Sequence, residues 1–277
     1  MLSLILAIIS SAGVSLVMRL SVDHVKNNIS MLSSCYVCCT ALAVFYTMPG
    51  KALNTEGIGT ATILGIAAGV LLLIGFVFLQ YNVRSSGVVL SAIFSKLGIL
   101  VPTGISILFF HERPSMLQGF GFLLSVIAII LINYDKDSSS KGFGAGLLLL
   151  LLANGLADAM AKIYDELGTP DLSDYYLCLS FFVALILSIL LAVSKKQKLS
   201  RPDVLYGLLL GIPNYYSIRF LVRALTEVPA VITYPTYSVA TIVIISFAGV
   251  LFFKERLSSR QITAIVIILA ALIMLNI

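Results

Sequence analysis

The stretch that decides the fold occurs twice in the chain, at a constant spacing of 143 residues. Residues 109–115 read FFHERPS and residues 252–258 read FFKERLS, so five of the seven positions are identical. The same shift pairs further residues along the chain: Ser30 with Ser173, Cys35 with Cys178, Val88 with Val231, and Asn133 with Asn276. A chain rich in Leu and Ile produces chance matches, but not a shared motif at one constant shift. We therefore interpret the chain as an internal duplication.

The composition around these motifs is that of a membrane protein. Of the 277 residues, 59% are apolar and only 11% are charged, and the mean hydropathy is +1.05. A soluble domain of this length needs more charge to cover its surface. Apolar runs long enough to cross a bilayer as helices are predicted at residues 2–20, 30–49, 58–81, 87–110, 116–134, 143–163, 172–193, 204–226, 229–252 and 261–277.

These ten runs predict an all-α integral membrane protein with ten transmembrane helices in a 5+5 inverted repeat. Backbone groups in lipid must be bonded within their own segment, and the runs are too uniformly apolar for barrel strands. We place the first five-helix repeat at residues 1–137 and the second at residues 138–277. Because five is odd, the second repeat enters the membrane in the opposite sense, an arrangement that places a transporter's binding site between the repeats.

The polar residues argue against several classes of function. The net charge is +5, but the basic residues occupy short loops that set topology, so nucleic-acid binding is not predicted. We find no nucleophile–base arrangement, phosphate-binding glycine loop or metal-ligand spacing, and we therefore expect neither an enzyme nor a bound cofactor or metal. Cys35, Cys38 and Cys39 lack His or carboxylate neighbours in the sequence, which favours buried apolar thiols.

Each copy of the motif ends a fourth helix and forms the turn after it. The turn residues are Leu108 to Arg113 and Leu251 to Arg256, followed by Gln118 or Gln261, and Arg223 to Ala230 link the eighth and ninth helices. In these residues the chain resembles the drug/metabolite transporter superfamily, specifically its ten-helix EamA-type members, over nearly its whole length. The resemblance implies a secondary transporter whose central cavity is lined mainly by helices one, three, four, six, eight and nine.

Two basic residues lie inside predicted spans, Lys96 in the fourth and Arg219 in the eighth. A charge at the bilayer centre costs about 2.5–3.5 kcal/mol on insertion scales, so both should face protein or water. We predict that both bind a carboxylate or phosphate group of the solute. The alternative for each is snorkelling to the membrane surface or a structural ion pair.

A polar stripe recurs on equivalent helices of the two halves. The sixth helix carries three polar residues at a spacing of four, which the shift pairs with three residues of the first helix: Asn154, Asp158 and Lys162 with Ser11, Ser15 and Arg19. This spacing puts each trio on one helix face, so Asn154, Ser11 and Ser15 are predicted to bind solute. Asp158 is the proton-coupling candidate, because burial favours a protonated carboxyl. Its alternative is an ion pair with Lys162 or Lys96.

Aromatic side chains complete the predicted binding site. Tyr215 lies in the eighth helix, and Tyr234 and Tyr237 lie in the ninth. In the first half, the shift places Ser91 and Phe94 at the positions of Tyr234 and Tyr237. We predict that these five residues contact the solute by stacking and hydrogen bonding. The alternative for the tyrosines is an aromatic belt at the membrane interface.

The sequence therefore predicts a secondary active transporter that moves a small polar metabolite by alternating access, with export as one direction to test. The buried cations favour an anionic or zwitterionic metabolite such as an amino acid. Two alternatives stay open: an organic-cation or drug exporter with Asp158 as counter-charge, and a non-transporting membrane subunit of a lipid-linked sugar flipping system. The predicted partners are a small-molecule solute and membrane lipid, and a homodimer is left open.

The predicted location is the inner (plasma) membrane, as a multi-pass protein with both termini on the same side. The loops on one side carry twelve Lys and Arg residues, and those on the side of the termini carry four. Positive loops prefer the cytoplasm, so this count favours termini outside the cell. The family resemblance instead implies cytoplasmic termini.

Overall fold

The computed structural model describes residues 2–47, 57–98, 143–227, 230–254 and 259–275, with scattered positions between 100 and 127. Its helices are α1 (Leu2–Ser21), α2 (Asn28–Tyr46), α4 (Ile58–Ser86), α5 (Val88–Leu97), α8 (Phe143–Leu167), α9 (Ser173–Ser194), α10 (Arg201–Glu227), α11 (Ala230–Phe253) and α12 (Ser259–Leu275), with a 3₁₀ turn η1 (Pro170–Leu172) before α9. The described residues contain no strand. The all-α fold is confirmed, while most of the predicted span 116–134 lies outside the described residues.

Several of these helices have the length and composition to cross a bilayer. Within the described residues there are five: Leu2–Ser21, Asn28–Tyr46, Ile58–Ser86, Pro170–Ser194 and Thr236–Phe253. Their outward side chains are large and apolar, for example Phe45, Ile63 and Phe247, each more than half exposed. Such a surface is stable against lipid and not against water. The chain is therefore a multi-pass membrane protein.

The two halves are interleaved in the bundle, and their contacts occur in matched pairs. α1 of the first half packs on α10 of the second, and α4 correspondingly packs on α8. The contact of α2 with α10 is matched by that of α9 with α4. The contact of α1 with α11 is likewise matched by that of α8 with α5. Under the 143-residue shift these partners exchange places, because α1 corresponds to α8, α2 to α9, α4 to α10, and α5 to α11. The two repeats are thus related by an approximate two-fold axis.

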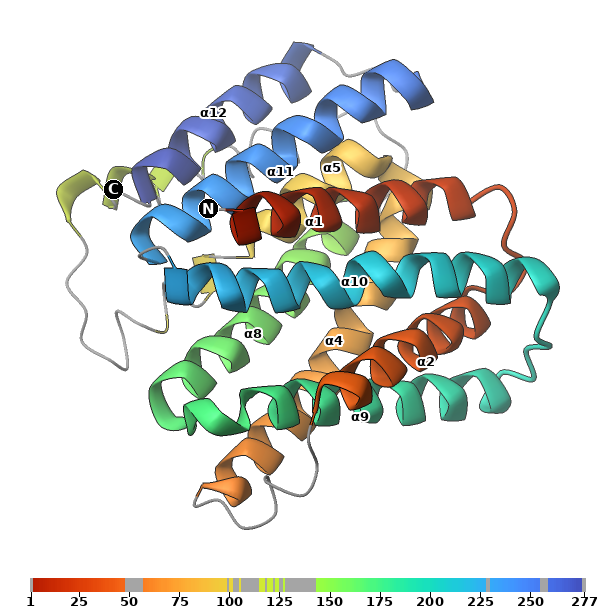
Figure 1. Ribbon diagram of the computed structural model, residues 1–277. Helices are drawn as coiled ribbons and strands as arrows, with labels where there is room; N and C mark the ends of the chain where they lie inside the picture. The colour runs from red at the N-terminus through yellow and green to blue at the C-terminus, as the bar shows by residue number, and fades with distance from the viewer. Residues whose placement is uncertain are drawn as a thin grey trace.

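The connecting segments show that the repeats run in opposite senses. The segment between α1 and α2 contacts the one between α9 and α10, where the Asn27 side chain donates a hydrogen bond to the Lys198 carbonyl at 2.6 Å. At the other end, the Thr47 hydroxyl after α2 donates to the Asp174 carbonyl at the start of α9, at 3.2 Å. Figure 1 accordingly shows α2 and α9, which are equivalent in the two repeats, running in opposite directions.

We name the two ends of the bundle by these contacts. The basic end contains the segments 22–27 and 195–200, with Lys195, Lys196, Lys198 and Arg201 exposed at its surface. The Arg219 end contains Thr47, Thr169 and Asp174, and the side chain of Arg219 reaches it.

Glycines four residues apart allow helices of different halves to approach closely. A Cβ added at Gly69 of α4 would lie 2.5 Å from the Ser180 carbonyl oxygen of α9. A Cβ added at Gly211 of α10 would lie 2.7 Å from the Cys35 carbonyl oxygen of α2. Gly65 and Gly207 precede these residues by one turn and are similarly close to the facing helix. Both pairs follow the small-residue spacing by which helices associate within membranes.

Asp203 fastens the two halves together at the basic end. Its carboxylate accepts hydrogen bonds at 3.0 and 3.2 Å from the backbone N–H groups of Lys26 and Asn27, the two residues just before α2. It also accepts the Ser200 N–H at 3.1 Å, while its own N–H donates to the Ser200 hydroxyl at 3.4 Å. This reciprocal pair is a capping box for α10. One fully buried carboxylate thus caps α10 and binds the segment just before α2 of the other repeat.

The close approach at Gly69 predicts the effect of adding one methyl group. We expect Gly69→Ala to destabilise the folded protein by about 1–3 kcal/mol, because the methyl group overlaps the backbone of α9. Gly59→Ala is the matched control, since nothing lies within 4 Å of a Cβ at that helical position. Thermal unfolding in detergent is measurable with a thiol-reactive dye, because Cys35 and Cys39 are buried. Equal melting temperatures for the two variants would contradict close packing at Gly69.

The Asp203 hydrogen bonds predict a second stability effect. We expect Asp203→Asn to lose about 1.5–3 kcal/mol, because hydrogen bonds to a charged group contribute about that much. Asp23→Asn is the control, since the side chain of Asp23 is 72% exposed and, among the described ion pairs, pairs only with Arg19 four residues earlier. The same dye assay compares the two variants. An Asp203→Asn melting temperature within error of the Asp23→Asn value would show that the carboxylate does not hold the halves together.

Candidate functional site

The first candidate site is centred on Lys96, in the last turn of α5. Its ammonium nitrogen donates a hydrogen bond to the Ser11 hydroxyl of α1 at 3.0 Å. The same nitrogen lies 3.9 Å from the centre of the Tyr237 ring of α11. A cation at this distance over an aromatic face is attracted by the ring quadrupole. Lys96 therefore connects three helices, one of them from the other repeat.

The depth of this cluster follows from Ser11, which is the tenth residue of the twenty-residue α1. A hydroxyl midway along a membrane-crossing helix is about 15 Å from either helix end, at about 1.5 Å per residue. Lys96 is held at this depth by its hydrogen bond and does not snorkel to either surface. Lys96 thus faces protein groups inside the bundle, and its predicted binding of a solute carboxylate or phosphate stays a prediction.

Asp158 of α8 supplies the acidic member of the cluster. The Asp158 carboxylate lies close enough to Lys96 to be influenced by its charge, although no hydrogen bond or ion pair joins the two side chains among the described contacts. The Asp158 side chain is exposed. The cluster thus combines a cation and an acceptor from different halves, Lys96 and Asp158.

Two glycines bring these charges together. α5 and α8 cross where Gly98 meets Gly155, and a Cβ added at Gly98 would lie 2.8 Å from the Gly155 backbone nitrogen. Lys96 precedes Gly98 by two residues, and Asp158 follows Gly155 by three. With no side chain at the crossing, the helices approach closely enough for the two charges to interact. Sequence reasoning missed this crossing, although Gly155 lies within an otherwise apolar helix and Gly98 directly follows one.

Thr241 is a further polar group beside this cluster. It lies one helical turn beyond Tyr237 in α11, so the two residues share a face. Its hydroxyl is buried and has no hydrogen-bond partner within the part of the chain that the structure describes. A buried hydroxyl without a partner is unfavourable and calls for a water molecule or a ligand group.

In the described part of the chain, four other predicted site residues, in α1, α5 and α8, contact only neighbouring parts of the protein. Ser15 is buried within α1. The Ser91 hydroxyl donates to the Gly87 carbonyl at 2.7 Å, and Phe94 is fully buried in the apolar core. The Asn154 amide donates to the Leu150 carbonyl of its own helix at 3.1 Å. None of these contacts joins the Lys96 cluster among the described residues.

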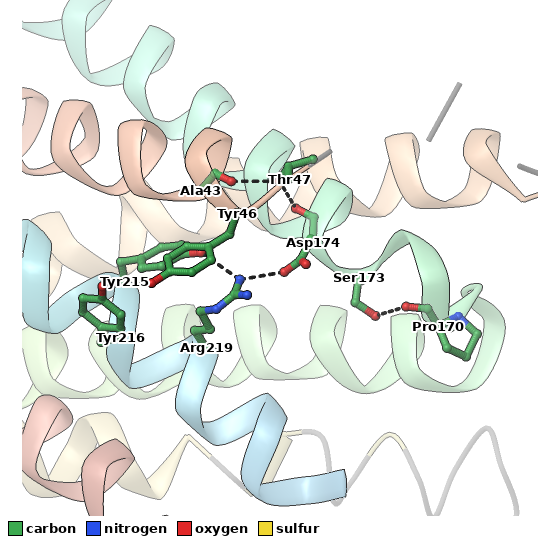
Figure 2. Close-up of polar contacts among 9 residues, drawn as sticks. All are labelled: Ala43, Tyr46, Thr47, Pro170, Ser173, Asp174, Tyr215, Tyr216 and Arg219. Carbon is green, nitrogen blue, oxygen red and sulfur yellow. Dashed lines mark hydrogen bonds and ion pairs between the residues drawn. The ribbon is translucent and has the colours of Figure 1, made fainter. Parts of the chain in front are cut away.

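Arg219 and Tyr215 form a separate cluster at the Arg219 end. Figure 2 shows the guanidinium of Arg219 between the rings of Tyr46 and Tyr215 and the carboxylate of Asp174. Its Nη1 donates to Asp174 Oδ1 at 2.8 Å and to the Tyr215 hydroxyl at 2.9 Å. The guanidinium carbon lies 3.9 Å from the centre of the Tyr46 ring.

This second cluster is the ion-pair alternative that the sequence allowed for Arg219. Sequence reasoning missed both new partners, Asp174 at the start of α9 and Tyr46 at the end of α2. The signal for Asp174 was a carboxylate at a helix start, which is equally typical of a solvent-facing cap. The structure brings Lys96, Ser11, Tyr237 and Asp158 together but not Arg219 and Tyr215 with them. Tyr234 lies in α11, and its side chain is outside the described residues.

The clustered cysteines pack as apolar side chains. The Cys39 thiol donates to the Gly211 carbonyl at 3.3 Å, and the Asn214 amide donates to Cys39 Sγ at 3.4 Å. All four cysteines are free thiols. The described residues contain no group of three or more His, Cys, Asp or Glu side chains arranged to hold a metal ion.

Two interleaved, oppositely directed helical repeats with a charged cluster halfway through the membrane define a transporter of the drug/metabolite type. The model of the EamA-like transporter family matches the chain twice, at residues 1–134 and at residues 145–277. The chain therefore belongs to the EamA-like transporter family. This is a family of transporters and not of enzymes. The match confirms the resemblance to EamA-type transporters that the sequence showed.

Two individual proteins illustrate the similarity. A protein of Haemophilus influenzae (strain ATCC 51907 / DSM 11121 / KW20 / Rd), described as uncharacterized, is 24% identical over 282 residues, covering 98% of this chain and 96% of its own length. A crystal structure superimposes with a TM-score of 0.63 at 14% identity, covering 99% of this chain and 94% of the other. The second similarity concerns the fold alone.

Proposed function

We propose that the chain is a secondary active transporter that moves a small anionic or zwitterionic metabolite, such as an amino acid, by alternating access. The observation that carries the proposal is the Lys96 cluster. Lys96 holds Ser11 of its own repeat and stacks on Tyr237 of the other, midway through the membrane. A solute carboxylate that replaces the Ser11 hydroxyl at Lys96 would alter the contact of Lys96 with Tyr237 of the other repeat, which is how binding is coupled to the movement of the repeats.

The arrangement of charges supports an anionic group on the solute rather than a cation. The Tyr237 ring, which would otherwise attract an organic cation, is already covered by the Lys96 ammonium. An arriving cation would meet Lys96 first and be repelled. Asp158 remains beside Lys96 as the acceptor for an ammonium group of a zwitterion or for a coupling proton.

Transport by the purified protein tests this proposal. We expect proteoliposomes loaded with an equimolar mixture of the twenty common amino acids and small carboxylates to release a defined subset under an imposed proton gradient, measured by mass spectrometry. Lys96→Gln should reduce this flux at least tenfold, because the solute carboxylate loses its partner. Lys195→Gln, at an exposed position of the basic end, is the control and should retain the flux.

Asp158→Asn separates coupling from binding in the same assay. If Asp158 carries the proton, this variant keeps solute exchange between the two sides of the membrane but loses acceleration by the proton gradient. Flux that responds to the gradient as in the parent protein would remove Asp158 from that role. Absence of any solute flux from the parent protein would instead favour a non-transporting subunit of a lipid-linked sugar flipping system.

For the orientation, we infer that the basic end faces the cytoplasm of a plasma membrane, with both termini outside. The positive residues at this end support the inference. Two leucines at opposite ends suit a labelling test because they are about equally exposed. Leu199 at the basic end is 65% exposed, and Leu167 at the Arg219 end is 63% exposed. In intact cells, a membrane-impermeant maleimide should label Leu167→Cys and leave Leu199→Cys unlabelled until the cells are permeabilised. The opposite pattern would give the chain cytoplasmic termini.

A further inference from the structure

Arg219 lies on the same face of α10 as two lipid-exposed residues. Leu205 and Ile212 precede it at intervals of seven residues, and both are exposed on that helix, by 66% and 49%. Residues seven apart occupy one line along a helix, two turns from each other. Arg219 therefore continues a lipid-facing line toward the Arg219 end. Its ion pair with Asp174 is partly exposed there, since the two side chains are 28% and 48% accessible.

An apolar groove of about 340 Å³ lies beside this pair, between α1 and α10. Five apolar or aromatic residues form most of its lining: Ile9, Ile212, Pro213, Tyr216 and Phe220. Ile9 and Ile212 are about half exposed, so the groove opens sideways from the bundle. In a membrane-spanning segment, such an opening faces the acyl chains of the bilayer.

The groove and the charged pair are continuous through Tyr216. This residue lines the groove, and its hydroxyl lies 3.3 Å from that of Tyr46, whose ring covers Arg219. Pro213 faces Gly13 near the middle of α1, and Arg219 follows Pro213 by six residues. At about 1.5 Å per residue, Arg219 is about 9 Å closer to the Arg219 end. The groove extends from Pro213 near the midplane to Phe220 beside Arg219, so the charged pair lies at the end of the groove nearer the membrane surface, the order of polarity in a phospholipid.

The charges at this site select one type of head group. Among the described hydrogen bonds, the ion pair uses only Nη1 of Arg219 and Oδ1 of Asp174. The remaining guanidinium donors suit a phosphate, but a phosphate alone would also face the Asp174 carboxylate. A neighbouring ammonium removes this repulsion and donates to Asp174. We propose that Arg219, Asp174 and the α1–α10 groove bind a phosphatidylethanolamine molecule, with its phosphate at Arg219, its ammonium at Asp174 and an acyl chain in the groove.

Native mass spectrometry of the full-length protein in detergent tests this site. The protein is titrated with phosphatidylethanolamine, phosphatidylcholine and phosphatidylglycerol that share the same acyl chains. We expect one phosphatidylethanolamine to bind at least fivefold more tightly than either of the others. Choline has no N–H to donate to Asp174, and glycerol has no positive charge to offset that carboxylate.

Variants separate the three parts of the site. Arg219→Gln should abolish tight binding of all three lipids, whereas Asp174→Asn should remove the preference for ethanolamine and retain binding. Ser10→Phe, which fills the groove at a residue lining it, should reduce binding with both charges intact. Arg84→Gln is the control. Arg84 donates a hydrogen bond to the Val22 carbonyl at the basic end, so its substitution leaves this site unchanged.

The outcomes decide between a lipid site and its alternatives. Equal binding of the three lipids, or an unchanged preference in Asp174→Asn, would overturn the head-group assignment. Competition by water-soluble phosphoethanolamine as strong as that of the lipid would overturn the role of the groove and indicate a site for a soluble zwitterion. Because lipid binding is measured without solute flux, these results are independent of whether Lys96 is the transport site.

Discussion

The structure depends on one constraint of the bilayer: backbone groups in lipid have no water to bond to, so each crossing segment must be a complete helix. Helices in lipid then associate through close packing rather than through the hydrophobic effect. Here the packing is between repeats, through Gly69 of α4 on α9 and Gly211 of α10 on α2. The position of every polar side chain inside the bundle follows from how these helices meet.

The fold could be predicted from the sequence because each feature that determines it can be read from a local stretch of the chain. Hydropathy gives the spans, and the duplicated FFxERxS motif with an odd helix count gives the inversion. The site could be predicted only in part, because it depends on the register between antiparallel helices of different repeats. Lys96, Ser11 and Tyr237 share no spacing in the sequence, and their meeting is set by the packing of α5, α1 and α11 against one another.

Lys96 and Arg219 show the limit most clearly, since the sequence treats the two residues alike. Each is a cation in an apolar helix, and each is found 3.9 Å from the centre of a tyrosine ring of the other repeat. Their surroundings differ because of the helix face that carries them. Lys96 lies opposite Ser11 in mid-membrane, whereas Arg219 follows the exposed residues Leu205 and Ile212 toward one end. A helical wheel of α10 would reveal this difference, because it places Arg219 on the same face as the apolar residues Leu205 and Ile212.

The inverted repeats have similar backbones, but their two ends are fastened by different chemistry. Under the 143-residue shift, Asp203 corresponds to Thr60 and Arg219 to Phe76, so neither charged fastening has a counterpart in the first half. One end is held by a buried carboxylate on four N–H groups, and the other by a partly exposed ion pair and stacked tyrosines. Opening the basic end therefore exposes a buried charge, while opening the Arg219 end separates groups that already meet solvent. Under the proposed alternating access, two conformations that symmetry would make equal would differ in energy, and a solute would have to bind the less stable one more tightly to populate it.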